Sequence, residues 1–152
     1  MHSTDRSRGR WFAALRSEAG TTVIETAILL PVFLTFMLGI FEFGRALWLQ
    51  SSLQSAAQAA ARCAVVSASS TCNSNSATAS YASTQVIGFS VPSSDFSVSS
   101  SGTCGSGGSK TVTAGYPFSF IVTALFPYNS GTNSNCSGSY NICLTARATR
   151  PC

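Results

Sequence analysis

Acid–base chemistry has few residues to work with in this sequence. The chain of 152 residues contains five acidic residues and one histidine, His2. Only 9% of its residues are charged, against about 25% in typical proteins. From residue 43 onward Asp95 is the only acidic residue and Lys110 the only lysine. General acid–base catalysis needs titratable groups held close together, and a serine triad needs a histidine. The composition therefore predicts a protein that is not an enzyme and carries no cofactor.

Residues 21–43 form an apolar run that is long enough to cross a membrane. The run holds thirteen Val, Ile, Leu and Phe residues, and its only charges are Glu25 and Glu42. About 20 such residues span a bilayer as a helix, and a usual secretory signal has a shorter apolar core. Four arginines precede the run, within residues 1–20. Since positive charge stays on the cytoplasmic side, we expect a basic cytoplasmic leader over 1–20 and an external chain from residue 44.

Glu25 is the most informative residue, because a carboxylate inside an apolar run is costly. One interpretation is a side chain that reaches back to the headgroups. The other starts from Gly20: if a peptidase cuts after it, Thr21 gains a free amine one helical turn before Glu25. The amine and the carboxylate then neutralise each other, within one helix or between neighbours. Such a pair favours assembly. Farther along, Glu42 and Arg45 are expected to form a juxtamembrane i,i+3 pair worth a few tenths of a kcal/mol.

The segment from Gly20 to Glu25 resembles the processing site of type IV-like prepilins, with a basic leader, a glycine and a glutamate as the fifth mature residue. The chain is similar to the TadE-like proteins, minor pilins or pseudopilins of tight-adherence (Flp-type) pili, closely over about residues 17–66 and loosely over the remainder. The segments that carry this similarity are residues 24–31, 39–45, 56–63, 112–118 and 144–147. Major pilins of this system are little more than the helix, so about a hundred further residues indicate a minor subunit.

The remaining sequence predicts an α+β fold, with one long helix packed on a small antiparallel sheet in a pilin-like arrangement. Leu49, Leu53 and the alanines that follow at three- and four-residue spacing extend the helix over 44–66, so that it runs from about Ser17 to Val66. Residues 67–152 are expected to be an external Ser/Gly-rich domain. It begins with a helix over 77–87 capped by Gly88. Strands are expected at 96–99, 111–116, 118–125 and 142–149, and a loop at 129–139.

Six cysteines in an external domain predict disulfides. A zinc site is not expected, because the sequence has no C-x₂-C pair and no histidine near the cysteines. Fifteen pairings are possible, and the sequence alone does not choose among them. The pairing that we expect has two local bridges and one that ties the two ends of the sheet: Cys63–Cys72, Cys136–Cys143 and Cys104–Cys152.

The resemblance implies a minor pilin or pseudopilin that takes part in assembly, initiation or capping of a tight-adherence pilus. Its implied partners are a prepilin peptidase, the major Flp-type pilin, sibling pseudopilins and the inner-membrane assembly machinery, besides the lipid bilayer. A net charge of +4 without a basic cluster in the C-terminal two thirds predicts no nucleic-acid binding. Two alternatives stay open: a permanently anchored periplasmic scaffold of the machinery, and a surface adhesin.

Overall fold

The computed structural model describes residues 18–66, 70–104, 106–121, 129–130, 136 and 139–152. The chain divides into two units, Met1–Phe41 and Glu42–Cys152. Leader residues 1–17 and residues 122–125 of an expected strand lie outside the described part.

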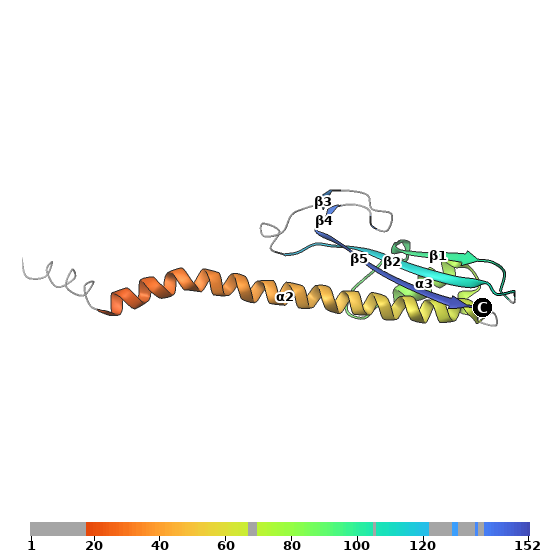
Figure 1. Cartoon of the computed structure of the whole chain (residues 1–152), viewed down its shortest axis with the longest axis horizontal. Coiled ribbons are helices and arrows are strands. Elements are labelled where there is room, and N and C mark those ends of the chain that lie inside the picture. The colour runs from red at the N-terminus through yellow and green to blue at the C-terminus, as the bar shows by residue number, and fades with distance from the viewer. Residues whose placement is uncertain (1–17, 67–69, 105, 122–128, 131–135, 137–138) are drawn as a thin grey trace, which may run out of the picture. The chain divides into compact units, whose positions relative to one another are not determined.

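One helix, α2 (Glu18–Val65), accounts for 48 residues and confirms the long helix that the apolar run and the alanine stripe predict. Pro31 lies inside it, and Figure 1 shows that its red-to-orange section bends, as a proline within a helix predicts. Two threonines within the apolar run donate to the backbone of their own helix: Thr26 Oγ1 to Thr22 O at 2.8 Å, and Thr35 Oγ1 to Pro31 O at 2.8 Å. These hydroxyls therefore need no partner outside α2.

The sheet is three-stranded and antiparallel, in the order β1-β2-β5 (Figure 1). Its strands are β1 (Phe96–Ser101), β2 (Ser109–Phe118) and β5 (Ile142–Pro151). The register sets Val112 opposite Ala148 and Ala114 opposite Ala146, and all four side chains are buried. These residues alternate along β2 and β5 and form the inner face of the sheet.

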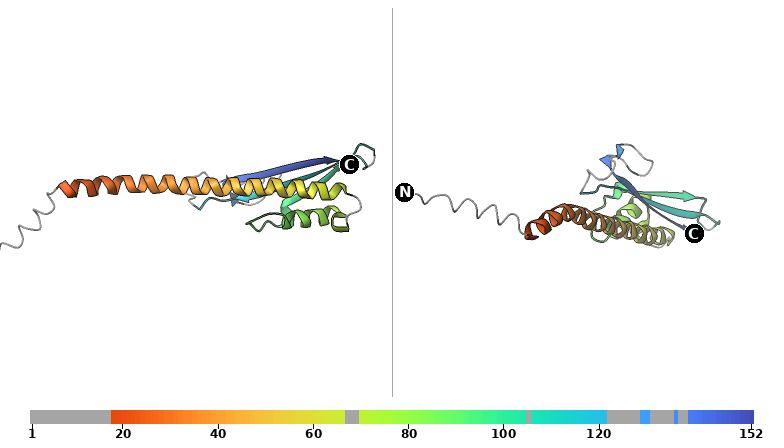
Figure 2. Two further views of the ribbon diagram at one scale, coloured as in Figure 1. Left: turned by 90° about the horizontal axis from the view of Figure 1, so that it is seen from below. Right: turned by 60° about the vertical axis from the view of Figure 1, so that its left-hand side comes forward.

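The core lies between the sheet and two helices. Figure 2 shows α2 side by side with α3 (Asn75–Thr84) on one face of the sheet. Six residues of α2 are fully buried there: Leu49, Leu53, Ala56, Ala57, Ala60 and Ala61. Four of them are alanines, whose small side chains let the helix approach the strands closely. The α+β class predicted from the sequence is confirmed.

Helix α3 begins and ends earlier than the sequence predicts. Ser74 caps its N-terminus by accepting from the backbone N–H of Ala77 at 3.1 Å. It ends at Thr84 with Gln85 as the C-cap, so the expected cap at Gly88 is wrong. Gly88 has a φ of +85°, but it serves the turn that follows, where an added Cβ would lie 3.5 Å from Trp48 Nε1.

The expected strand over 118–125 is also wrong in its described part, because β2 ends at Phe118 and residues 119–121 are not in a strand. The polar groups at this point bond elsewhere: the Phe120 N–H donates to Asn141 Oδ1 at 3.0 Å. The expected loop over 129–139 contains two short paired strands at its ends, β3 (Asn129–Ser130) and β4 (Ser139–Tyr140). Short 3₁₀ helices, η1 (Ser70–Cys72) and η2 (Ser93–Asp95), complete the described elements.

Strand β5 is an edge of the sheet, and α2 covers part of that edge. Gln50 Nε2 donates to Thr145 O at 2.7 Å, and Gln54 Nε2 donates to Arg147 O at 3.2 Å. The two glutamines lie one helical turn apart and meet carbonyls two residues apart on the strand. Open edges attract other strands, so the two amides protect this edge while they fix α2 along β5.

Three disulfides staple the domain: Cys63–Cys72, Cys104–Cys152 and Cys136–Cys143, the pairs expected from the sequence. Cys63–Cys72 joins the end of α2 to η1. Cys104–Cys152 joins the β1–β2 loop to the residue that follows β5, and Cys136–Cys143 joins the region between β3 and β4 to β5.

The bridge with the longest enclosed segment is expected to stabilise the fold most. Loop-closure entropy gives about 4 kcal/mol for the 48-residue separation of Cys104–Cys152 and about 2.5 kcal/mol for the 9-residue separation of Cys63–Cys72. Replacing both members of each pair by serine and unfolding the full chain with urea in detergent, followed by circular dichroism, measures the two losses. A larger loss from the Cys63/Cys72 variant would contradict this expectation.

Candidate functional site

The residues of the candidate processing site lie at the beginning of α2. Gly20 and Thr21 fall within the first turn, which starts at Glu18, and Glu25 follows Thr21 by one helical turn. The Glu25 side chain is exposed, and the one ion pair among the described residues is formed elsewhere.

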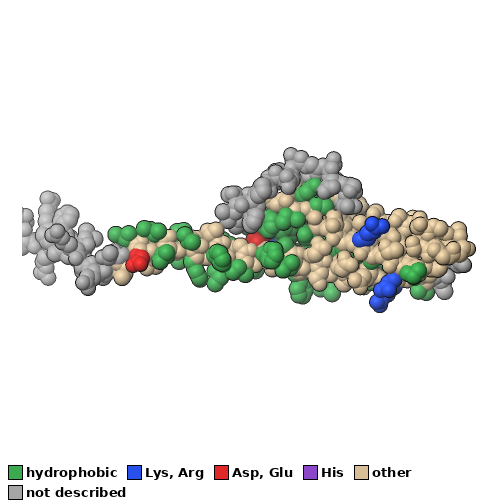
Figure 3. All heavy atoms as spheres, viewed as in Figure 1, with side chains coloured by type: hydrophobic (Ala, Val, Ile, Leu, Met, Phe, Trp, Pro, Cys, Tyr) green, Lys and Arg blue, Asp and Glu red, His purple; other side chains and the backbone are tan. Residues whose placement is uncertain are grey.

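Around Glu25, α2 exposes apolar side chains on every side. Figure 3 shows hydrophobic side chains over the part of α2 that precedes residue 42. Their exposed fractions run from 49% for Leu38 to 73% for Phe36. The large apolar residues of this surface are Val23, Ile24, Ile28, Leu29, Leu30, Val32, Phe33, Leu34, Phe36, Met37, Leu38, Ile40 and Phe41. Soluble monomers rarely expose apolar patches of more than a few hundred Å². By length and composition α2 is a candidate membrane-spanning helix, with none of its most apolar window buried.

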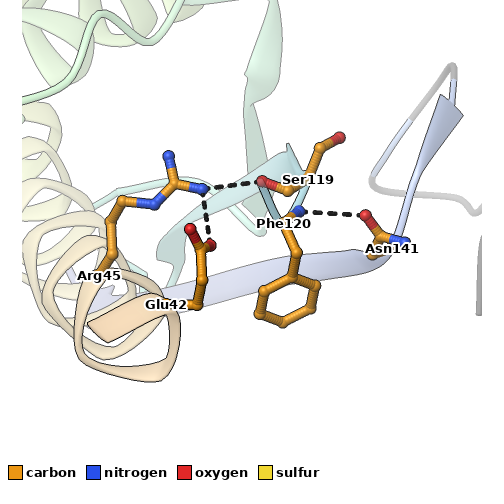
Figure 4. Close-up of polar contacts among 5 residues, drawn as sticks. All are labelled: Glu42, Arg45, Ser119, Phe120 and Asn141. Carbon is orange, nitrogen blue, oxygen red and sulfur yellow. Dashed lines mark hydrogen bonds and ion pairs between the residues drawn. The ribbon is translucent and has the colours of Figure 1, made fainter. Parts of the chain in front are cut away.

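A second cluster of polar groups lies where the folded domain begins (Figure 4). Arg45 Nη2 lies 3.1 Å from Glu42 Oε2 and donates to Ser119 O at 2.9 Å. The Arg45 guanidinium carbon also sits 4.6 Å from the centre of the Phe118 ring. Glu42 is only 2% exposed. This ion pair is therefore almost removed from water on its acidic side.

The same cluster continues to β5. Asn141 Oδ1 accepts from the Phe120 N–H, and the Phe118 and Phe120 rings meet edge to face at 5.3 Å. Ser119 and Phe120 follow the end of β2, and Asn141 precedes β5. The contacts thus join α2 to the end of β2 and the start of β5 (Figure 4).

The i,i+3 pair of Glu42 and Arg45 that the sequence predicts is confirmed, but Glu42 is more deeply buried than a pair worth a few tenths of a kcal/mol implies. A pair in water is worth tenths of a kcal/mol, whereas a desolvated pair with further hydrogen bonds is strongly coupled. The sequence did contain a signal for this burial. Glu42 continues the spacing of the buried stripe through Ala46, Leu49 and Leu53 at steps of four, three and four residues, so it had to face the sheet.

The described residues offer little else for chemistry. No three His, Cys, Asp or Glu side chains among them lie close enough together to hold a metal ion. An open groove lies between α3 and the start of β1, with hydroxyl and amide groups around an apolar floor. Its lining residues are Asn75, Ser76, Ala79, Ser80, Ser93, Ser94, Phe96 and Val98. Beside it, burial raises the pKa of the Asp95 carboxyl, while a hydrogen bond from Ser94 acts in the opposite direction.

Among the comparisons with known proteins, one finds a match, and it is confined to residues within α2. The family model described as TadE-like protein matches residues 20–62. This segment is TadE-like. The match spans both clusters, from Gly20 and Glu25 to Glu42 and Arg45, and it confirms the family that the sequence resembles. No curated protein and no solved structure matches the chain.

The TadE-like segment suggests an involvement in a tight-adherence pilus system. Together with the candidate membrane-spanning helix, it fits a membrane-anchored protein.

Removing Arg45 is expected to destabilise the fold strongly. Arg45→Met leaves the buried Glu42 carboxylate without its cation, which costs about 3 to 5 kcal/mol. The double variant Glu42→Leu/Arg45→Met removes both charges and is expected to cost less than this single change. Urea unfolding of the full chain in detergent measures both. Arg62→Met, at an exposed arginine of the same helix, serves as the control and is expected to stay within about 0.5 kcal/mol of the parent. A loss from Arg45→Met as small as the control's would contradict the role of the pair.

Proposed function

We propose that this protein is a minor pilin or pseudopilin that takes part in assembling, initiating or capping a tight-adherence pilus. The observation that carries the proposal is the TadE-like match over residues 20–62, which includes the exposed apolar part of α2 before residue 42 and its one carboxylate, Glu25. An unsatisfied apolar surface with one charge in it is suited to exchanging lipid neighbours for protein neighbours. A purely static anchor gains nothing from that charge.

In the proposed mechanism a peptidase removes the leader after Gly20. Thr21 then begins the mature chain, and its amine pairs with Glu25 of the same or a neighbouring helix. The pair neutralises a carboxylate that costs about 2.5 to 3.5 kcal/mol when it is unpaired at the centre of a bilayer. When the helix moves from the bilayer into a helical filament, neighbouring helices replace lipid against the apolar surface of α2, and the Thr21 amine continues to neutralise Glu25. The domain that follows α2 caps, initiates or decorates the filament.

The proposed topology has the leader in the cytoplasm, residues 21–43 in the inner membrane, and residues 44–66 and 67–152 in the periplasm or, after assembly, outside the cell. The arginines of the leader support this orientation. Three disulfides in the folded domain support an oxidising compartment for it. The proposed partners are a prepilin peptidase, the major Flp-type pilin, sibling pseudopilins and the assembly machinery of the inner membrane.

Replacing Gly20 by leucine is expected to block removal of the leader, because the bulky side chain stands directly before the bond to be cut. Mass spectrometry of the protein from cells measures the N-terminus: the parent chain begins at Thr21 and the variant at Met1. Gly39→Leu is the matched control, since an added Cβ at Gly39 meets nothing within 4 Å, and it should be shortened normally. A normally shortened Gly20→Leu chain would contradict the site, and an intact parent chain would favour the permanent anchor.

Glu25→Ala is expected to keep the protein in the membrane but reduce its incorporation into filaments. The change removes the partner of the Thr21 amine, while the apolar surface that holds α2 in lipid stays intact. Quantifying the protein in sheared filaments and in membranes separates the two effects. Thr26→Val, which removes a neighbouring polar group without changing charge, should incorporate like the parent. Equal amounts of the Glu25→Ala chain and the parent chain in filaments would refute the pairing.

A further inference from the structure

The exposed side of α2 changes from apolar to polar within the folded domain. Phe43, Leu47 and Trp48 are 62%, 54% and 61% exposed. Farther along the helix the exposed positions are polar: Ser51, Ser55, Gln58 and Arg62. The opposite side of α2 is already buried against the domain from Glu42 onward. The folded domain therefore begins about two helical turns before the apolar surface of the helix ends.

Isoleucines from the rest of the domain lie at this same level. The Ile87 N–H donates to Ser52 Oγ at 2.8 Å, and Ile87 and Trp48 line one shallow hollow on the surface. Ile121 and Ile142 directly follow Phe120 and Asn141 of the polar cluster around Arg45. The exposed fractions of Ile87, Ile121 and Ile142 are 67%, 70% and 43%. We call the set of six exposed residues the apolar rim: Phe43, Leu47, Trp48, Ile87, Ile121 and Ile142.

We propose that the apolar rim rests in the headgroup layer of the bilayer that α2 enters, so that the folded domain itself touches the membrane. The rim continues the candidate membrane-spanning surface without a break along α2, which makes the lipid layer its nearest apolar partner. Trp48 lies five residues beyond Phe43, about 7.5 Å along a helix. The headgroup layer is about 5 to 7 Å thick on each side, and tryptophan is enriched there because its ring is apolar and its N–H is polar.

The far end of the domain supports this assignment by contrast. Just after the end of α2, Val66 is the one large apolar residue that the described part of the chain exposes at this end of the domain. The β1–β2 loop, at the same end, consists of Gly, Ser, Thr and Cys. The rim also accounts for the burial of Glu42. A charged pair at the depth of the headgroups is shielded by its own domain and carries no bare carboxylate into the lipid. The proposal needs the membrane anchor but does not depend on entry into a filament.

Tryptophan fluorescence in vesicles tests this contact in the full chain. Trp11→Phe leaves Trp48 as the only tryptophan. The protein is reconstituted into phosphatidylcholine and phosphatidylglycerol vesicles that carry bromine either near the headgroup or near the end of the acyl chain. Trp48 is expected to emit at shorter wavelength than tryptophan in water and to lose more intensity to the shallow bromine than to the deep one.

The decisive variant carries its tryptophan on the loop of the domain: Ile87→Trp in a Trp11→Phe/Trp48→Phe background. It is expected to be quenched by the shallow bromine, whereas the matched variant Val66→Trp is expected to respond only to an aqueous quencher. Aqueous quenching alone at Ile87→Trp would overturn the proposal. The proposal would also be overturned if the tryptophan at position 87 were shielded from the aqueous quencher more strongly at higher protein-to-lipid ratios and were not quenched by bromine. That result would assign the rim to a contact with a neighbouring subunit. Phe36→Trp reports on the anchor itself: if it is quenched and Ile87→Trp is not, the lipid contact of the domain fails and the anchor stands.

Discussion

The α2 helix carries two apolar surfaces, and they require different partners. From Leu49 onward a narrow stripe of leucine and alanine is fully buried against the sheet. Before residue 42 thirteen large apolar side chains are exposed around the whole helix. At about −0.3 to −0.6 kcal/mol each near the centre of a bilayer, they favour insertion by roughly 4 to 8 kcal/mol. That gain exceeds the cost of one embedded carboxylate, so Glu25 does not outweigh the preference of the helix for lipid.

The Glu42–Arg45 pair lies where these two surfaces meet. An i,i+3 pair on a bare helix would be solvated and weak. Here Arg45 also binds the carbonyl of Ser119 and stacks on Phe118, so the pair anchors α2 to the end of β2. The two glutamine contacts to β5 extend that attachment along the helix. The domain is thereby held to α2 from the first residues that leave the apolar segment.

Much of this architecture follows from the sequence, because its signals are local. The apolar run and the alanine stripe predicted a helix from residue 17 to 66, against Glu18–Val65 in the structure. The strands expected at 111–116 and 142–149 match β2 and β5 to within two residues at each end. The predictions were wrong where contacts between residues far apart in the sequence determine the local structure. Gly88 has the φ of a helix cap but serves a turn beside Trp48. Beyond Phe118 the backbone bonds to Asn141 and Arg45 instead of a strand. The burial of Glu42 could have been predicted only by treating this charged residue as part of the apolar stripe of α2.

The central claim is that the exposed apolar surface of α2 is held in lipid. Extraction of membranes with alkaline carbonate, from cells that make the full chain, tests it most directly, because this treatment releases peripheral proteins and leaves helices that cross the bilayer. The protein is expected to stay in the membrane pellet and to enter solution only with detergent. Its release by carbonate alone, in a folded and monomeric form, would contradict the account.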